Sequence, residues 1–173
     1  MIFSITAAFR GVTDITPGVL ERMGVKGLIL DIDNTLTTHD NPVPSEGVTE
    51  WLADLRKNGI AAVIVSNNKA PRVKPFADLL GLEFVCEGAK PLTKGYSEAA
   101  GVLGMPKDQI AAVGDQIFTD VAGANLYGIK MLYVQPIAKE PKKQRFIRFK
   151  RVLEKPFLPK KVYRRDPEKE RKI

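Results

Sequence analysis

Short aliphatic runs and amphipathic segments alternate along most of the chain. The runs are nearly continuous, which is typical of strands buried on both faces, and they predict strands at 27–31, 61–66, 82–86, 110–114 and 130–134. The segments between them carry apolar residues at helical spacing and predict helices at 45–58, 72–80, 94–103 and 118–127. This β-α alternation with short connections predicts an α/β fold with a parallel sheet and helices on both of its faces.

Polar residues follow four of the predicted strands at their carboxyl ends. They are Asp31 and Asp33, Ser66 with Asn67 and Asn68, Lys90, and Asp115 with Asp120. Each group alone is weak, because an isolated acidic pair is usually a turn or a helix cap. The carboxyl ends of parallel strands meet at one sheet edge, which is where ligands of open α/β sheets bind. The set therefore predicts a site of several acids, one cation and one hydroxyl.

Composition describes a soluble globular protein. Of 173 residues, 44% are apolar and 27% charged, and no run is long enough to cross a membrane. A single cysteine, Cys86, excludes an internal disulfide and fits a reducing compartment, so we expect a cytoplasmic protein. The single histidine, His39, has no second histidine with which to share a metal.

Charge is unevenly distributed. Residues 1–138 carry 12 basic and 15 acidic side chains, a net charge of −3, whereas residues 139–173 carry 15 basic and 5 acidic ones, a net charge of +10. With the Pro-containing stretch 136–143 as a boundary, this predicts a core domain at 1–138 and a basic C-terminal extension at 139–173. The extension implies an anionic partner.

The order of these residues resembles the motifs of the haloacid dehalogenase-like (HAD) superfamily. The motifs are Asp-x-Asp-x-Thr at 31–35, a strand-terminal Ser66, Lys90, and Gly-Asp-x-x-x-x-Asp at 114–120. Segments 14–17, 26–36, 65–68 and 114–120 are similar to YqeG-type phosphatases of subfamily IIIA, a likeness that spans roughly residues 14–136. The resemblance implies a HAD-like Rossmannoid three-layer α/β/α fold.

The resemblance also implies catalytic roles. Asp31 would attack phosphorus and form an aspartyl-phosphate, and Asp33 would protonate the leaving group and then activate water. Lys90 would neutralise the nucleophile and the phosphoryl oxygens, while Ser66 and Asn67 would bind the substrate phosphate.

A metal site is implied at the same edge. Mg²⁺ would be bound by Asp31, Asp115 and the backbone carbonyl of Asp33. Asp120 has several interpretations: a second carboxylate at the periphery of the metal site, a support for Lys90, or a helix-start residue that accepts from free N–H groups.

The spacing of the motifs leaves no room for an inserted cap domain. Asp33 and Ser66 are 33 residues apart, and the predicted helix 45–58 fills most of that interval. The site is therefore expected to be open, which suits a large substrate such as a protein, a nucleic acid or a lipid headgroup.

The extension contains a basic amphipathic segment at 142–153, with Phe146, Phe149 and Leu153 at near-helical spacing. Four interpretations stay open: packing of the apolar side on the core, peripheral contact with the inner face of an anionic membrane, RNA binding, and, for the final residues, a solvated end.

Relatives of the YqeG-type group include mitochondrial and plastid phosphatidylglycerophosphate phosphatases. The resemblance therefore implies a Mg²⁺-dependent phosphomonoesterase that converts phosphatidylglycerophosphate to phosphatidylglycerol. The alternatives are a phosphatase of a soluble sugar, nucleotide or protein phosphate and, from another class, a nucleic-acid- or ribosome-associated binding protein.

Overall fold

A six-stranded parallel sheet forms the centre of the computed structural model, which describes residues 1–140, 142 and 144–165. The expectation of a solvated end at 166–173 lies outside these residues. The strand order is β1-β6-β5-β2-β3-β4, and every pair is parallel. The strands are β1 (Ala7–Phe9), β2 (Gly27–Leu30), β3 (Ala61–Val65), β4 (Glu83–Val85), β5 (Ile110–Gly114) and β6 (Lys130–Val134).

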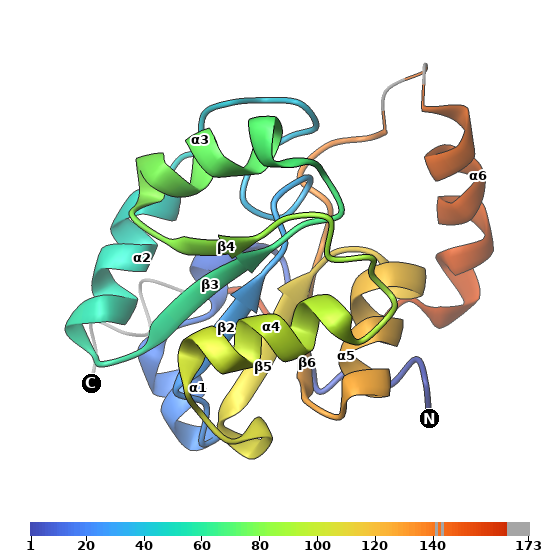
Figure 1. Ribbon diagram of the computed structural model, residues 1–173. Coiled ribbons are helices and arrows are strands. Elements are labelled where there is room, and N and C mark those ends of the chain that lie inside the picture. The colour runs from blue at the N-terminus through green and yellow to red at the C-terminus, as the bar shows by residue number, and fades with distance from the viewer. Residues whose placement is uncertain (141, 143, 166–173) are drawn as a thin grey trace.

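Helices cover both faces of the sheet, as Figure 1 shows. One hydrophobic cluster joins the sheet to α1 (Pro17–Arg22), α2 (Val48–Lys57) and α3 (Ala70–Leu80). A second cluster joins the opposite face to α4 (Lys94–Leu103) and α5 (Ala122–Tyr127). The predicted three-layer α/β/α fold is therefore confirmed.

The five predicted strands are present, and their ends shift by one residue at most. The predicted helix at 118–127 begins instead as a π-helical turn, η3 (Ile117–Val121), before α5. Strand β1 and helix α1 were not predicted. The division into 1–138 and 139–173 stays a prediction.

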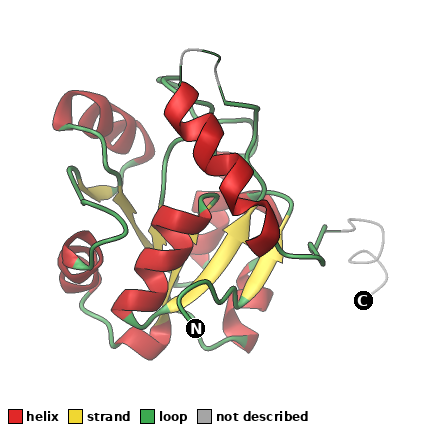
Figure 2. Ribbon diagram, turned by 90° about the vertical axis from the view of Figure 1, so that its right-hand side faces the viewer, coloured by secondary structure: helices red, strands yellow, loops and turns green. Residues whose placement is uncertain are grey.

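Helix α6 (Arg145–Glu154) lies beyond the carboxyl ends of the strands, to the right in Figure 1 and facing the viewer in Figure 2. After α6 the chain returns to the sheet edge, where the amide of Tyr163 donates to the carbonyl of Ala8 at 2.7 Å and the amide of Arg10 donates to the carbonyl of Tyr163 at 2.9 Å. These bonds fasten the segment that follows α6 to β1.

Among the residues that the structure describes, no helix combines the length and the apolar character needed to cross a membrane.

Candidate active site

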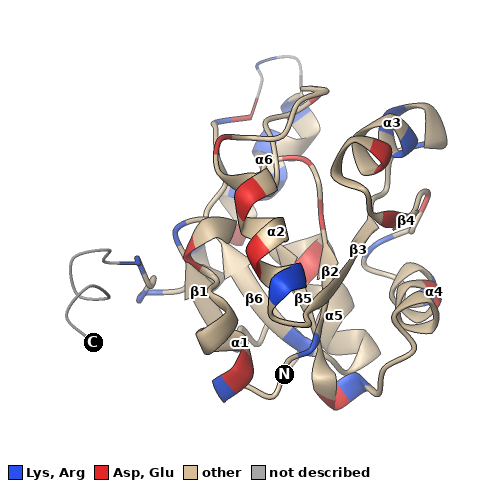
Figure 3. Ribbon diagram, turned by 90° about the vertical axis from the view of Figure 1, so that its left-hand side faces the viewer, with Lys and Arg blue, Asp and Glu red and all other residues tan. Residues whose placement is uncertain are grey.

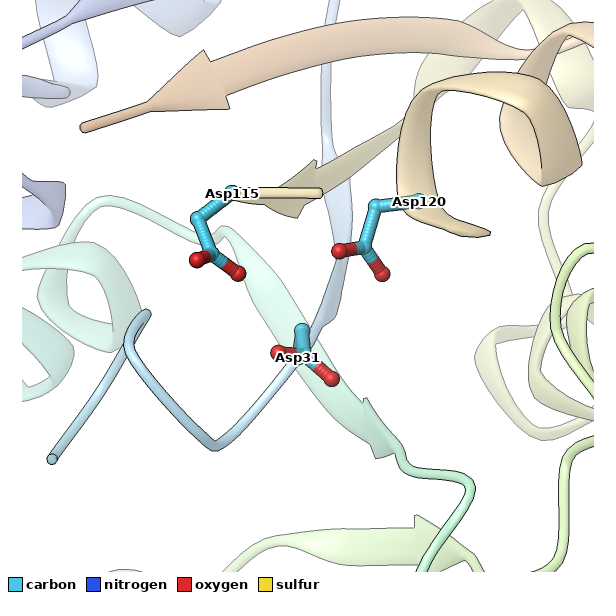
Figure 4. A group of neighbouring side chains, drawn as sticks. All are labelled: Asp31, Asp115 and Asp120. Carbon is cyan, nitrogen blue, oxygen red and sulfur yellow. The ribbon is translucent and has the colours of Figure 1, made fainter. Parts of the chain in front are cut away.

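Three buried aspartates meet at the carboxyl ends of two neighbouring strands. Asp31 directly follows β2 and Asp115 directly follows β5, and the amide of Asp31 donates to the carbonyl of Val113 at 3.0 Å. Asp120 lies in η3, which folds back over the end of β5. One carboxylate oxygen from each aspartate lies within 4.8 Å of the others, and Figure 4 shows the three side chains converging. The topology thus brings together acids that are 84 and 5 residues apart.

Lys90 lies between two of these carboxylates. Its Nζ donates to Oδ1 of Asp31 at 2.5 Å and to Oδ1 of Asp120 at 2.7 Å, and the side chain is buried. The backbone of Lys90 is held by Asn67, whose Oδ1 accepts from the Lys90 amide at 2.7 Å and whose Nδ2 donates to its carbonyl at 3.0 Å. The cation is therefore fixed in both its main chain and its side chain.

Burial and charge shift the pKa values of these groups in definite directions. Burial raises the pKa of Asp31 to about 6, although Lys90 opposes the rise. Burial would lower the pKa of Lys90, but the Asp120 and Asp31 carboxylates outweigh it and raise that pKa, so Lys90 stays charged. Burial also raises the pKa of Asp115 well above its usual value, and Arg151 opposes this rise. The site therefore depends on cations to keep its acids ionised.

Asp33 is held apart from the three converging carboxylates. Its Oδ2 accepts from Nδ2 of Asn68 at 2.6 Å and its Oδ1 accepts from Nη2 of Arg72 at 2.9 Å. Ser66 lies nearby at the end of β3, and its hydroxyl accepts from the Asn68 amide at 3.1 Å. Asp33 thus has a different set of partners from Asp31, which is consistent with a different chemical role.

A pocket of about 250 Å³ opens over this group. Its lining includes residues that follow the strands, namely Asp31, Asp33, Ser66, Asn67, Asn68, Lys90, Gln116 and Thr119, together with His39 and Asp40. Phe146, Ile147 and Lys150 of α6, and Gln144 just before this helix, also line the pocket. The candidate site therefore includes side chains from far along the chain.

Two arginines contact the predicted acids and were not assigned to them from the sequence. Arg72 pairs with Asp33, and Arg151 of α6 forms an ion pair with Asp115. Arg72 follows Ser66 by only six residues, and this proximity was a usable signal. Arg151 lies within a run of many cations, so only its spacing of three residues from Glu154 set it apart.

The donor set fits a hard divalent cation. Asp31, Asp115 and Asp120 offer oxygen atoms only, all three are buried, and their oxygens lie close enough to share one ion. Both carboxylate oxygens of Asp120 accept from N–H donors, Oδ1 from Lys90 and Oδ2 from the amide of Gln116 at 3.1 Å. Asp31 and Asp115 each accept from a cation through one oxygen only, so they are the better placed ligands.

Comparison with known proteins gives a consistent result. The family model of haloacid dehalogenase-like hydrolases matches residues 37–128. The chain is 37% identical over 150 residues to the Bacillus subtilis (strain 168) protein named "Probable phosphatase YqeG", covering 86% of each. It is 32% identical over 127 residues to "Phosphatidylglycerophosphate phosphatase 1, chloroplastic" of Chlamydomonas reinhardtii, covering 68% of this chain and 47% of that protein.

Among solved structures, an uncharacterized protein from Listeria monocytogenes serotype 4b superposes with a TM-score of 0.56 at 19% identity. The match covers 68% of this chain and 84% of that one. At this identity the likeness concerns the fold alone.

Proposed function

The chain belongs to the haloacid dehalogenase-like hydrolases and is a phosphatase, and from this premise we propose that it is a Mg²⁺-dependent phosphomonoesterase with Asp31 as its nucleophile. The observation that carries the proposal is the placement of Lys90 between Asp31 and Asp120, all within bonding distance, with Lys90 and Asp31 among the residues that line the pocket. A carboxylate that attacks an anionic phosphate needs cationic charge beside it, and here that charge is buried and fixed.

The metal site would be made by Asp31, Asp115 and the backbone carbonyl of Asp33, with Asp120 at its periphery. A bound Mg²⁺ supplies positive charge that offsets the phosphate oxygens and orients them.

Different residues would carry out the separate steps of hydrolysis. A carboxylate oxygen of Asp31 would bond phosphorus as the bond between phosphorus and the leaving alkoxide breaks. Lys90 stabilises the negative charge that gathers on the phosphoryl oxygens, and the hydroxyl of Ser66 donates to one of them.

Asp33 handles the proton in this scheme. It would first protonate the leaving alkoxide and later accept a proton from the water that hydrolyses the aspartyl-phosphate. Asn68 and Arg72 fix the orientation of this side chain, since each donates to one of its carboxylate oxygens.

Replacing Asp31 by Asn tests the nucleophile. The substitution keeps the shape and removes the attacking carboxylate, so phosphate release should fall to the background level while the circular dichroism spectrum and melting temperature stay close to those of the wild type. The matched control is Asp54→Asn, an acid on the exposed side of α2, which should keep full activity. Turnover retained by Asp31→Asn would refute the assignment.

For the substrate we propose the phosphate of an anionic lipid, with phosphatidylglycerophosphate favoured, at an anionic membrane surface. The algal relative's name supports this substrate. Helix α6 adds physical support, since Phe146 and Phe149 are exposed and cations flank them. A second pocket of about 840 Å³ beside α6 has the apolar residues Tyr133, Pro136 and Leu158 in its lining. Its charged lining residues are five basic ones, Lys139, Lys142, Arg148, Arg151 and Lys155, and two acidic ones, Glu140 and Glu154, and this net positive charge suits an anionic amphiphile.

A substrate panel tests this choice. Phosphate release is measured with phosphatidylglycerophosphate in vesicles and with soluble sugar, nucleotide and peptide phosphates, each with and without Mg²⁺. We expect the highest kcat/KM for the vesicle substrate, and its loss when Mg²⁺ is chelated. A soluble phosphate that is hydrolysed faster would replace the lipid as the substrate and leave the phosphatase reaction intact.

A further inference from the structure

Arg151, on the inner side of α6, contacts the loop that follows β5. Its guanidinium forms an ion pair with Oδ2 of Asp115, and Nη1 donates to the carbonyl of the same residue at 2.7 Å. Its Nε donates to Oε1 of Glu140 at 2.9 Å. The side chain is mostly buried, so water competes weakly for these bonds.

Glu154 joins α6 to the same loop from the other side. Its Oε2 accepts from Nη1 of Arg151 at 3.2 Å, and its Oε1 accepts from the amide of Phe118 at 3.1 Å. The Glu154 side chain is 1% exposed. A fully buried carboxylate that links Arg151 to the 115–118 loop fixes the arginine in place, because the alternative positions would leave a charge buried without a partner.

The two carboxylate oxygens of Asp115 have different neighbours. Oδ2 is bound to Arg151, whereas Oδ1 faces the hydroxyl of Thr35 at 3.5 Å, and Thr35 also reaches Oδ2 of Asp31 at 3.4 Å. Oδ1 therefore lies on the side of Asp115 that faces Asp31, where the proposed cation would bind.

We infer that Arg151 is a positioning residue of the metal site: its guanidinium fixes Oδ2 and the backbone of Asp115 so that Oδ1 is presented to a divalent cation. The inference rests on the proposed function, and it makes the C-terminal helix a structural part of that site. A planar guanidinium suits the task, because it reaches a carboxylate oxygen, a carbonyl and two further acids with one rigid group, which an ammonium does not.

A competing arrangement predicts the opposite result. If the guanidinium took the place of the cation, removing it would strengthen metal binding. If it positions Asp115, removing it would weaken metal binding, since ligand carboxylates depend on their outer hydrogen-bond partners. Losing such a partner typically costs about 10- to 100-fold in metal affinity.

The test is the dissociation constant of Mg²⁺, measured by isothermal titration calorimetry on the full chain without substrate. We expect Arg151→Ala to raise it by about 10- to 100-fold and Arg151→Lys to recover part of the loss. The matched control is Arg22→Ala, which removes an exposed arginine of α1 that has no part in the proposed site and should bind Mg²⁺ as the wild type does. If circular dichroism shows that Arg151→Ala does not fold, Arg151→Gln takes its place with the same expectation.

An affinity for Mg²⁺ in Arg151→Ala that is unchanged or tighter would overturn the inference. This failure is distinct from that of the proposed function: a wild-type chain that binds no Mg²⁺ and needs none for turnover would refute the metal site itself. A wild type that binds Mg²⁺, with an arginine variant that binds it equally well, would refute only the role of Arg151.

Discussion

Gly114 shows how closely the residues of the site are packed. It is the last residue of β5, and Asp120 lies directly against its Cα. A Cβ added at Gly114 would lie 2.4 Å from Cγ of Asp120 and 2.6 Å from its Cβ. The absence of a side chain at this position is what allows Asp120 to reach Lys90.

Gly114→Ala should therefore impair activity, although it adds only one methyl group. The added methyl group displaces Asp120, and with it one of the two carboxylates that hold Lys90, so we expect a clear fall in kcat/KM. Overpacking should also lower the free energy of unfolding by about 1–3 kcal/mol. Phosphate release and urea denaturation measure the two effects.

Gly101→Ala is the matched control for this substitution. Gly101 lies within α4, and a Cβ there meets nothing within 4 Å. Ala is favoured over Gly inside a helix, so this variant should be as active as the wild type and equally or more stable. Equal activity in Gly114→Ala and Gly101→Ala would contradict the view that Asp120 needs the space above Gly114.

The individual site residues could be predicted from the sequence to different degrees. Asp31 and Asp115 follow apolar runs that end sharply, and parallel pairing then fixes them as neighbours. Arg151 could not be predicted in this way, because it belongs to no strand end and is one of many cations. Its position depends on where α6 lies relative to the sheet, which the local pattern does not encode.

At the scale of the elements, the buried strands and α4 were the most predictable. Strands β5 and β6 and helix α4 have the predicted bounds, because each is bounded by turn residues and has a clear apolar period. The prediction at 118–127 missed η3, whose wider turn lets the side chain of Asp120 fold back onto the amide of Gln116. Side-chain bonding of this kind overrides helical propensity locally.

Strand β1 was missed for a different reason. It has only three residues, Ala7–Phe9, and follows polar Ser4 and Thr6, so it has too short an apolar run to stand out. It exists because β6 pairs with it on one side and the segment at Tyr163 bonds to it on the other. These partners lie far from β1 in the sequence, so the local pattern does not reveal the strand.

The faces of helix α6 are reversed relative to those of an ordinary surface helix, which buries its apolar face. Its charged residues Arg151 and Glu154 face the protein, whereas its apolar residues face outward: the exposed fractions are 73% for Phe146, 60% for Phe149 and 56% for Val152. This arrangement speaks against packing of the apolar side on the core. Figure 3 shows that the helix also carries Lys and Arg. An apolar stripe flanked by cations is what an anionic bilayer binds.

At the scale of the whole molecule, charge distribution and the position of α6 favour the same orientation on a membrane. Residues 1–138 are net acidic and residues 139–173 strongly basic, so an anionic surface repels the first part and attracts the second. Because residues of α6 also line the pocket, a chain bound through α6 would have its active site close to the lipid headgroups.

We therefore predict that the chain binds anionic vesicles through α6. In vesicle sedimentation, binding should fall as salt rises, because screening weakens the attraction, and should be much weaker with neutral phosphatidylcholine. Replacing Arg145 and Arg148 by Gln should reduce the partition coefficient by about fivefold for each cation, which corresponds to about 1 kcal/mol per basic residue at the surface.

The apolar side of α6 gives the sharper test, since charge alone can attract many proteins to anionic lipid. Phe146→Ser with Phe149→Ser should lower binding to anionic vesicles at every salt concentration. The matched control is Leu79→Ser, which removes an equally exposed apolar residue from α3. Both variants should keep the circular dichroism spectrum of the wild type. If the Phe double variant binds vesicles as well as Leu79→Ser does, α6 is not the membrane contact, and the basic residues after it would have to provide any attraction to the bilayer.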